Sequence, residues 1–176
     1  MRTAIVLGVG PLEGLGAKLS QRFSREHHVL VAGRSAEKLA PVVEQVREAG
    51  GSAEPLVTDA TDERAVQALF AAAGPSLELA IYNAGNNTPG AIETMEAAYF
   101  EASWRVCCFG GFLFGREAAR SMKAGGGTVL FTGASASLRG RANFGAFNSS
   151  KAGLRTFAQA LAKECGPAGI HVGHVV

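Results

Sequence analysis

The chain has 176 residues, of which 47% are hydrophobic and 18% are charged, so it is long enough to bury one core and too apolar to be disordered. Its 17 basic and 15 acidic side chains form no long run of like charge, which argues against a nucleic-acid or anionic-membrane partner. We therefore expect one globular domain over residues 1–176.

Short apolar or β-branched runs alternate with longer amphipathic segments along the chain, which is the pattern of βαβ units. Ser35 and Thr61 are typical first residues of helices. Because the runs are almost continuously apolar, we expect strands buried on both faces, in an α/β fold with a parallel sheet covered by helices. Strands are predicted at 3–9, 28–33, 54–58, 77–83, 127–133 and 170–176, and helices near 14–26, 35–49, 62–73, 93–122 and 145–165.

The stretch GVGPLEGLG, residues 8–16, follows the first predicted strand and opens the first helix. Glycines at such a junction let the backbone turn sharply and approach a pyrophosphate, whose charge lies at the helix N-terminus. A tight turn alone needs one glycine, whereas this stretch has several. The position and the glycine content together predict a dinucleotide-binding site.

The spacing of the last three glycines in this stretch resembles that of the short-chain dehydrogenase/reductase family. Further landmarks follow in the family's order: Asp59 after the third strand, NAG at 83–85 and SK at 150–151. Together they cover nearly the whole chain. The resemblance implies a Rossmann-type doubly wound parallel β-sheet with strand order 3-2-1-4-5-6, and hydride transfer between a nicotinamide and a carbonyl or alcohol.

The resemblance also assigns cofactor contacts to particular positions. From the residues alone, Asp59 is also compatible with a turn or a helix cap, and 83–85 with a plain strand exit. The implied contacts are Gly10, Gly14, Leu15 and Gly16 with the phosphates, Asp59 and Ala60 with the adenine, Asn83, Ala84 and Gly85 with the ribose and the strand edge, and Lys151 with the nicotinamide ribose.

The end of the second strand indicates which cofactor is preferred. An acidic residue there binds the ribose 2′-hydroxyl of NAD, whereas an arginine accommodates the 2′-phosphate of NADP. The sequence has Gly33 and then Arg34, which favours NADP over NAD. Glu13 departs from the basic residue that many NADP-dependent members carry near this pocket, and an ordinary solvated role for Arg34 is the alternative.

The catalytic residues of the family are a tyrosine that acts as general acid and base, a lysine four residues later, a serine and an asparagine. Lys151 is present, but the tyrosine, serine and asparagine positions hold Phe147, Ala134 and Cys107. Phenylalanine has no exchangeable proton, so the family's usual general acid is absent. We assign catalytic roles to Lys151 and to Ser135, which lies next to the serine position.

Each substitute proton donor has a structural alternative. Ser135 is also compatible with a turn hydroxyl that bonds the local backbone. Cys107 is either a reactive thiol or a small buried filler. We expect His171 and His174, in the last strand, to face the same side, where a histidine near the nicotinamide could donate a proton. Structural or solvent-facing roles are the alternative for both histidines.

Family members continue beyond the sixth strand into a substrate-covering segment and a last strand, whereas this sequence stops at Val176. We expect the substrate-covering segment and the last strand to be missing here. Because proteins avoid exposed edge strands, we expect a partner chain or further residues to cover the sixth strand. The helices predicted at 93–122 and 145–165 carry extra apolar stripes, and their counterparts pair across a two-fold axis in the family. A homodimer or homotetramer is therefore expected.

The three cysteines, Cys107, Cys108 and Cys165, fit neither a disulfide framework nor a set of metal ligands. The first ten residues reach Pro11 and Glu13 without a cleavage-like end, so we interpret them as a strand and not as a signal peptide. No apolar stretch approaches the roughly 18 residues of a membrane span. We expect a cytoplasmic protein with no metal.

Two function classes remain after these observations. The first is an NAD(P)-dependent oxidoreductase that acts on a small carbonyl or alcohol with a changed proton donor. The second is a catalytically silent NADP(H)-binding module, either a redox sensor or an inactive partner in an oligomer. Both need the cofactor residues, so those residues do not separate them. Analogy with the family favours the oxidoreductase.

Overall fold

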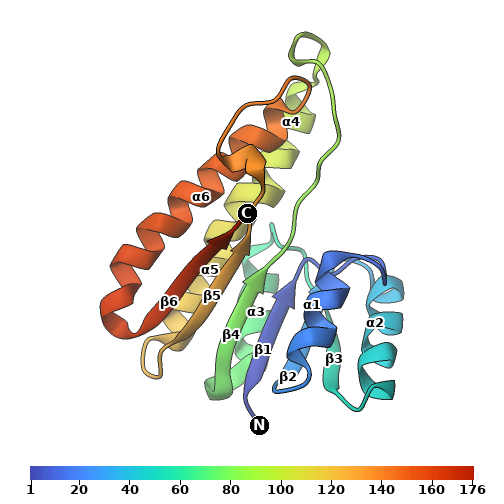
Figure 1. Cartoon of the computed structure of the whole chain (residues 1–176), viewed down its shortest axis with the longest axis vertical. Helices are drawn as coiled ribbons and strands as arrows, with labels where there is room; N and C mark the ends of the chain where they lie inside the picture. The colour runs from blue at the N-terminus through green and yellow to red at the C-terminus, as the bar shows by residue number, and fades with distance from the viewer.

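The computed structural model describes all 176 residues and contains one six-stranded parallel sheet. The strand order is β3-β2-β1-β4-β5-β6, which confirms the predicted order 3-2-1-4-5-6 (Figure 1). The strands are β1 (Thr3–Leu7), β2 (His28–Gly33), β3 (Ser52–Val57), β4 (Leu77–Tyr82), β5 (Gly127–Thr132) and β6 (Ile170–Val175).

Helices cover both faces of the sheet, as a doubly wound fold requires. One apolar cluster joins the sheet to α1 and α2, and a second joins its other face to α3, α5 and α6. The helices are α1 (Leu15–Phe23), α2 (Ala36–Glu48), α3 (Glu63–Ala73), α4 (Ala97–Trp104), α5 (Gly110–Met122) and α6 (Gly145–Cys165).

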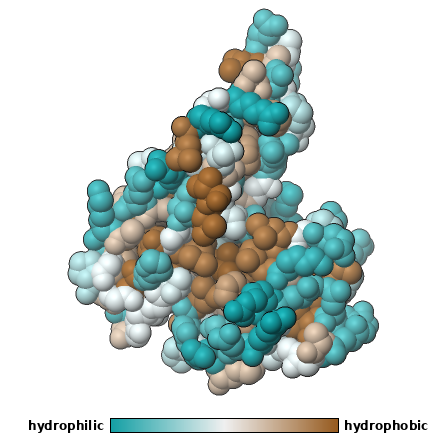
Figure 2. All heavy atoms as spheres, in the orientation of Figure 1, coloured by the Kyte–Doolittle hydropathy of each residue, from teal (hydrophilic) through white to brown (hydrophobic).

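The central strand β1 is buried along its whole length, because both apolar clusters use its side chains. On the α5 face, Tyr82, Phe114 and Phe131 are fully buried, with ring centroids 5.4 Å and 6.2 Å apart for the two pairs that include Tyr82. Burying one such side chain contributes roughly 1.5–3 kcal/mol. The other face of β5 and β6 is more open, and Figure 2 shows apolar residues gathered over the middle of this view.

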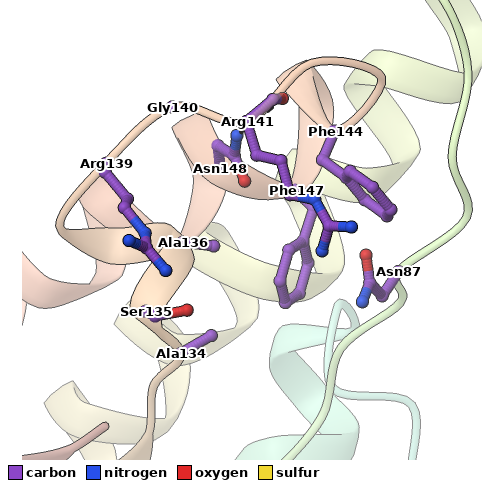
Figure 3. Close-up of a pocket in the computed structure, with 10 residues that line it drawn as sticks. All are labelled: Asn87, Ala134, Ser135, Ala136, Arg139, Gly140, Arg141, Phe144, Phe147 and Asn148. Atoms are coloured by element: carbon purple, nitrogen blue, oxygen red, sulfur yellow. Dashed lines mark hydrogen bonds between the residues drawn. The ribbon is translucent and has the colours of Figure 1, made fainter.

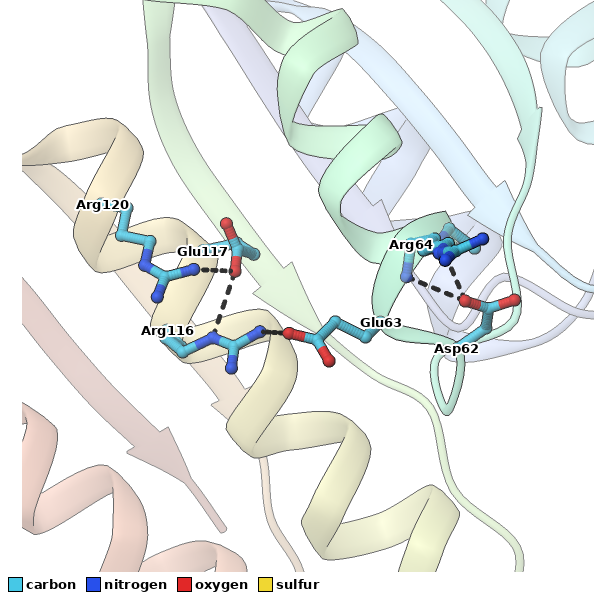
Figure 4. A network of polar contacts seen from close by, with 7 residues as sticks. Asp62, Glu63, Arg64, Arg116, Glu117 and Arg120 are labelled. Carbon is cyan, nitrogen blue, oxygen red and sulfur yellow. Dashed lines mark hydrogen bonds and ion pairs between the residues drawn. The ribbon is translucent and has the colours of Figure 1, made fainter.

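The start of α3 differs from the prediction. Asp62, not Thr61, is the N-cap, and its carboxylate accepts hydrogen bonds from the N–H groups of Arg64 and Ala65 at 2.8 Å and 3.2 Å (Figure 4). An aspartate in this position also complements the positive end of the helix dipole. Ser35 does stand at the N-cap of α2, but its side chain makes no capping hydrogen bond.

A small ion-pair network joins α3 to α5 (Figure 4). Arg116 pairs with Glu63 of α3 and with Glu117, and Arg120 contacts the same Glu117 carboxylate at 2.8 Å. Glu117 is buried, whereas its partner Arg120 and Glu63 are exposed, and surface ion pairs contribute about 0.2–1 kcal/mol each. The network therefore orients α5 against α3, while the buried aromatic side chains supply most of the packing energy.

Candidate cofactor and substrate site

The glycine turn after β1 brings three strands and one helix into close contact. Gly8 has φ +104°, and a Cβ there would lie 2.2 Å from the backbone nitrogen of Ala84, so no other residue fits. A Cβ on Gly16 would lie 2.8 Å from the Gly8 carbonyl oxygen. The N-cap Gly14 has no side chain to occupy the start of α1, which leaves a helix N-terminus suited to an anion.

A pocket of about 170 Å³ lies where β1, β2 and β4 end. The structure brings most of the predicted cofactor residues together in the wall of this pocket. Gly14 and Gly16 lie at the adjacent start of α1, and Leu15 between them is 58% exposed. The predicted residues that line the pocket are Gly10, Arg34, Asp59, Ala60, Asn83, Ala84 and Gly85.

Two of these side chains also hold the fold together. One carboxylate oxygen of Asp59 accepts hydrogen bonds from the N–H and the hydroxyl of Thr61, both at 2.8 Å, which closes a local turn. The Asn83 amide donates to the Gly8 carbonyl at 2.9 Å and accepts from the Thr132 hydroxyl at 3.1 Å. The amide of Asn83 thus ties β1, β4 and β5 together at the site.

Arg34 is the only basic residue that lines this pocket. Arg34 is exposed at the pocket wall and makes no ion pair. Glu13, which departs from the family pattern, lies 3.1 Å from the Lys18 ammonium in an exposed ion pair. Because Lys18 offsets the charge of Glu13, the acidic residue is not left alone beside the phosphate loop.

A second and larger cavity, of about 530 Å³, lies beyond the ends of β4 and β5, and Figure 3 shows the residues that line it. It is formed by the turn after β5, the 139–144 loop, the start of α6 and the segment after β4. The structure places Ala134, Ser135 and Phe147 in its wall. The lining residues are Asn87, Ala134, Ser135, Ala136, Arg139, Gly140, Arg141, Phe144, Phe147 and Asn148.

Lys151 lies between the two pockets and is 4% exposed. Its ammonium nitrogen donates to the Thr132 carbonyl at 2.8 Å and lies 5.8 Å from the ring centroid of Phe147, which lines the larger cavity. A Cβ placed on Gly85, in the smaller pocket, would be 3.6 Å from the same nitrogen. Burial lowers the pKa of Lys151 below its usual value.

The predicted helix 93–122 is interrupted beside the site. A π-helical turn, Arg105–Phe109, separates α4 from α5, and the buried Tyr82 hydroxyl donates to the Val106 carbonyl within it. Burial raises the pKa of Tyr82 well above its usual value, so this hydroxyl keeps its proton. A Cβ on Gly110 would lie 2.3 Å from that oxygen, which explains the glycine. Such π-turns often occur at functional sites.

Cys107 sits on this π-turn and is fully buried. Its sulfur lies 3.5 Å from the side-chain oxygen of Asn86, which also accepts a hydrogen bond from Ser103 at 2.8 Å. Burial and the neighbouring Cys107 raise the pKa of the Cys108 thiol. This environment is that of a buried filler, the alternative that the sequence left open for Cys107.

The expectation that His171 and His174 face the same side is wrong. Residues three apart in a strand point to opposite faces. His171 is exposed, whereas the ring of His174 packs against Gly133, where a Cβ would be 2.5 Å from its Nε2 atom. That nitrogen is buried without a hydrogen-bond partner. Burial, followed by Lys151 and Arg155, lowers the pKa of His174.

The lowered pKa of His174 predicts a loss of stability in acid. The unfolded chain binds a proton at this side chain near pH 6.5, before the folded protein does, so stability is retained above that value and falls as the pH drops through the folded pKa. Urea unfolding at several pH values should show this loss between neutral pH and pH 5. We expect the free energy of unfolding of His174→Gln to fall less over this pH range than that of the unaltered chain. Equal falls would mean that His174 is not the residue responsible.

Comparison with known proteins identifies the chain's family. The short chain dehydrogenase family model matches residues 2–176, so the chain belongs to the short-chain dehydrogenase family. These are oxidoreductases that use NAD or NADP. None of the helices is long and apolar enough to cross a membrane, and no group of three or more His, Cys, Asp or Glu side chains is placed to hold a metal ion.

Individual relatives and solved structures agree with this family. The chain is 30% identical to cis-4-hydroxycyclohexanecarboxylate dehydrogenase of Sinomonas cyclohexanicum, over 99% of this chain and 71% of that protein. It is 28% identical to versicolorin reductase of Emericella nidulans, over 99% of this chain and 67% of that protein. A short-chain dehydrogenase from Rhodopseudomonas palustris is 41% identical with a TM-score of 0.93, over 98% of this chain and 82% of that one.

The sequence alone does not single out several of the residues at the site. Asn86 binds Cys107 and Ser103, Asn148 lies in the wall of the larger cavity, and two arginines of the 139–144 loop point into it. No local pattern distinguishes these residues from ordinary polar loop residues. Their roles come from tertiary contacts that only the folded chain brings together.

Proposed function

We propose that the chain is an NADP(H)-dependent oxidoreductase that interconverts a carbonyl and an alcohol, with Lys151 as its proton donor and acceptor. The observation that carries this proposal is the place of the Lys151 ammonium, buried between the pocket with the predicted cofactor residues and the larger cavity. Ser135, whose hydroxyl makes no internal hydrogen bond in the cavity wall, is proposed to orient the substrate oxygen.

The pocket residues fit a dinucleotide. Gly8 and Gly16 allow backbone contacts that any side chain would block, and the uncapped start of α1 suits a pyrophosphate. The exposed, unpaired Arg34 suits a 2′-phosphate, which supports NADP. A bound nicotinamide would supply or accept the hydride.

The chain's own residues have to move the proton. In carbonyl reduction the oxygen gains a proton while the carbon gains the hydride, and the product is an alcohol. A protonated Lys151 can give that proton, and a neutral Lys151 can take it back in alcohol oxidation. Burial of Lys151 lowers its pKa, which brings both protonation states closer to the working pH.

A cofactor exchange tests the first part of the proposal. We expect NADPH to bind at least about tenfold more tightly than NADH, because losing charge-assisted hydrogen bonds costs about 1.5–3 kcal/mol. Arg34→Asp should remove or reverse this preference in fluorescence titrations, whereas the control Arg25→Asp, at another exposed arginine, should keep it. No binding of either cofactor to the unaltered chain would refute the proposal.

The second candidate is a silent NADP(H)-binding module. Phe147 and Ala134 in the cavity wall favour it, because neither can transfer a proton. Adding aldehydes, ketones and quinones to the NADPH-loaded chain separates the candidates: oxidation of NADPH supports the oxidoreductase. Tight binding with no oxidation by any compound supports the silent module.

We also propose that the chain forms a homodimer or homotetramer in the cytoplasm. An aromatic row of Trp104, Phe109, Phe112 and Phe157 runs across the helices, with neighbouring ring centroids about 6 Å apart. Trp104 and Phe112 are 41% and 38% exposed. The unpaired cysteines are consistent with a reducing compartment.

A charge placed in this aromatic row should weaken the oligomer. We expect Phe112→Glu to raise the dissociation constant at least about tenfold, since aromatic residues at the centre of an interface commonly contribute 2 kcal/mol or more. Light scattering behind a sizing column measures the mass. Val57→Glu, at an exposed apolar residue of β3, is the control. A monomeric unaltered chain would contradict the proposal.

A further inference from the structure

The larger cavity carries positive charge and no negative charge. Arg139 and Arg141 line it, and none of its other lining residues is charged. Neither arginine takes part in any of the ion pairs of the chain. Figure 3 shows both guanidinium groups directed from their loop into the cavity, toward Ser135 and the ring of Phe147. Two unpaired guanidinium groups in one cavity of about 530 Å³ favour an anionic ligand.

The loop that carries the arginines is held in place. The Asn148 amide donates to the Arg141 carbonyl at 3.1 Å, and the N–H of Gly90 donates to the Asn143 carbonyl at 2.8 Å. Asn143 has φ +66°, a left-handed conformation that asparagine tolerates better than most residues. The Arg141 guanidinium lies 4.9 Å from the ring centroid of Phe144. The backbone of the loop and the Arg141 guanidinium are therefore positioned before a ligand arrives, which reduces the entropic cost of binding at Arg141.

The rest of the cavity wall is suited to a ring. Phe144 and Phe147 present their rings, and Ala134 and Ala136 present small apolar surfaces. The side-chain oxygen of Asn148 is buried without a hydrogen-bond partner, and the residue is 8% exposed. An acceptor left unpaired in this way is normally satisfied by a donor, such as the hydroxyl of a ligand.

We infer that this cavity binds a small aromatic or alicyclic carboxylate, with the carboxylate at Arg139 and Arg141 and the ring against Phe144 and Phe147. Arginine's planar fork matches a carboxylate in two parallel hydrogen bonds. In this orientation the end of the ligand ring opposite the carboxylate lies toward Lys151, because Phe147 lines the cavity and its own ring is 5.8 Å from the Lys151 ammonium. That such a ligand is the substrate rests on the proposed function, whereas its binding does not.

Binding of matched neutral and anionic probes tests the inference. Calorimetry with the full chain compares cyclohexanecarboxylate and benzoate with cyclohexanecarboxamide and benzamide, which have the same rings without the charge. We expect the carboxylates to bind at least about tenfold more tightly, as charge-assisted hydrogen bonds imply. Equal affinity for acid and amide overturns the inference. Tighter binding of phenyl phosphate than of benzoate overturns the carboxylate assignment.

Variants locate the binding to this cavity. Arg139→Gln and Arg141→Gln should each weaken benzoate binding roughly tenfold, and the double variant should bind benzoate no better than benzamide. Arg25→Gln is the matched control, because Arg25 is an exposed arginine between α1 and β2 that does not line the cavity, and it should leave benzoate binding unchanged. Carboxylate selectivity that survives the double variant places the ligand elsewhere and overturns the inference.

Cofactor titration of the same samples keeps the two proposals apart. The arginine variants should bind NADPH as the unaltered chain does, because neither arginine lines the smaller pocket. NADPH binding without carboxylate selectivity overturns this inference and leaves the proposed function standing. Carboxylate selectivity without NADPH binding supports the inference and refutes the proposed function.

Discussion

Phe147→Tyr is expected to increase the rate of carbonyl reduction by about 100-fold or more, because general acid catalysis typically contributes a factor of 10² to 10⁴. The substitution adds one ionisable hydroxyl to a ring that already lines the larger cavity. The same ring lies 5.8 Å from the Lys151 ammonium, whose charge would favour the ionised form of a nearby phenol. The gain would show that proton transfer from Lys151 is slow and limits turnover in the unaltered chain.

Single-turnover measurements with NADPH and an active aldehyde or ketone separate this effect from cofactor binding. Phe100→Tyr is the control, because it adds the same hydroxyl to an exposed ring of α4 that lines neither of the two pockets. We expect Phe100→Tyr to change the rate little. A rate that Phe147→Tyr leaves unchanged would mean that Lys151 already transfers the proton efficiently, or that another step limits turnover.

The elements of the fold could be predicted because their signals are local. Continuous apolar runs and amphipathic spacing gave all six strands and the helix positions, and family resemblance gave the strand order. The predicted N-cap of α3 was wrong by one residue, because Thr61 and Asp62 are both favourable N-cap residues. In the folded chain the Thr61 hydroxyl donates to the Asp59 carboxylate, and Asp62 caps the helix. Competition between neighbouring cap residues is decided by such three-dimensional contacts.

The interruption of the long helix could not be predicted from its own residues. The π-turn Arg105–Phe109 coincides with the hydroxyl of Tyr82, which belongs to a strand more than 20 positions earlier in the chain. A side chain that reaches a helix carbonyl in this way competes with the regular hydrogen-bond ladder. The sequence of 93–122 contains no proline that would mark the break.

The phosphate turn could be predicted from the sequence, whereas the charge of the larger cavity could not. The phosphate turn has a local signature, because Gly8 and Gly16 are required by close backbone contacts that recur in this kind of turn. Arg139 and Arg141 have none, since their direction depends on a loop held by Asn148 and by a backbone contact with Gly90. Most of the residues predicted to bind a cofactor therefore line one pocket, whereas the charge of the larger cavity is apparent only in the folded chain.

Lys151→Met is expected to lower the rate of turnover by about 100-fold or more, because it removes the proposed proton donor and acceptor. The methionine keeps most of the apolar length of a side chain that is 4% exposed, so the fold should survive. Thermal unfolding checks this point. Lys163→Met, an exposed lysine on the same helix, is the matched control and should keep both the rate and the melting temperature.

Lys151→Arg and a pH profile distinguish proton transfer from simple charge. Arginine keeps the positive charge, but it cannot release its proton, so we expect NADPH binding with little turnover. In the unaltered chain, reduction should slow and oxidation should accelerate as the pH rises through the pKa of Lys151, which burial lowers below its usual value. If Lys151→Arg turned over at the original rate, the lysine would have only a binding role, and the proton would have to come from Ser135 or from water.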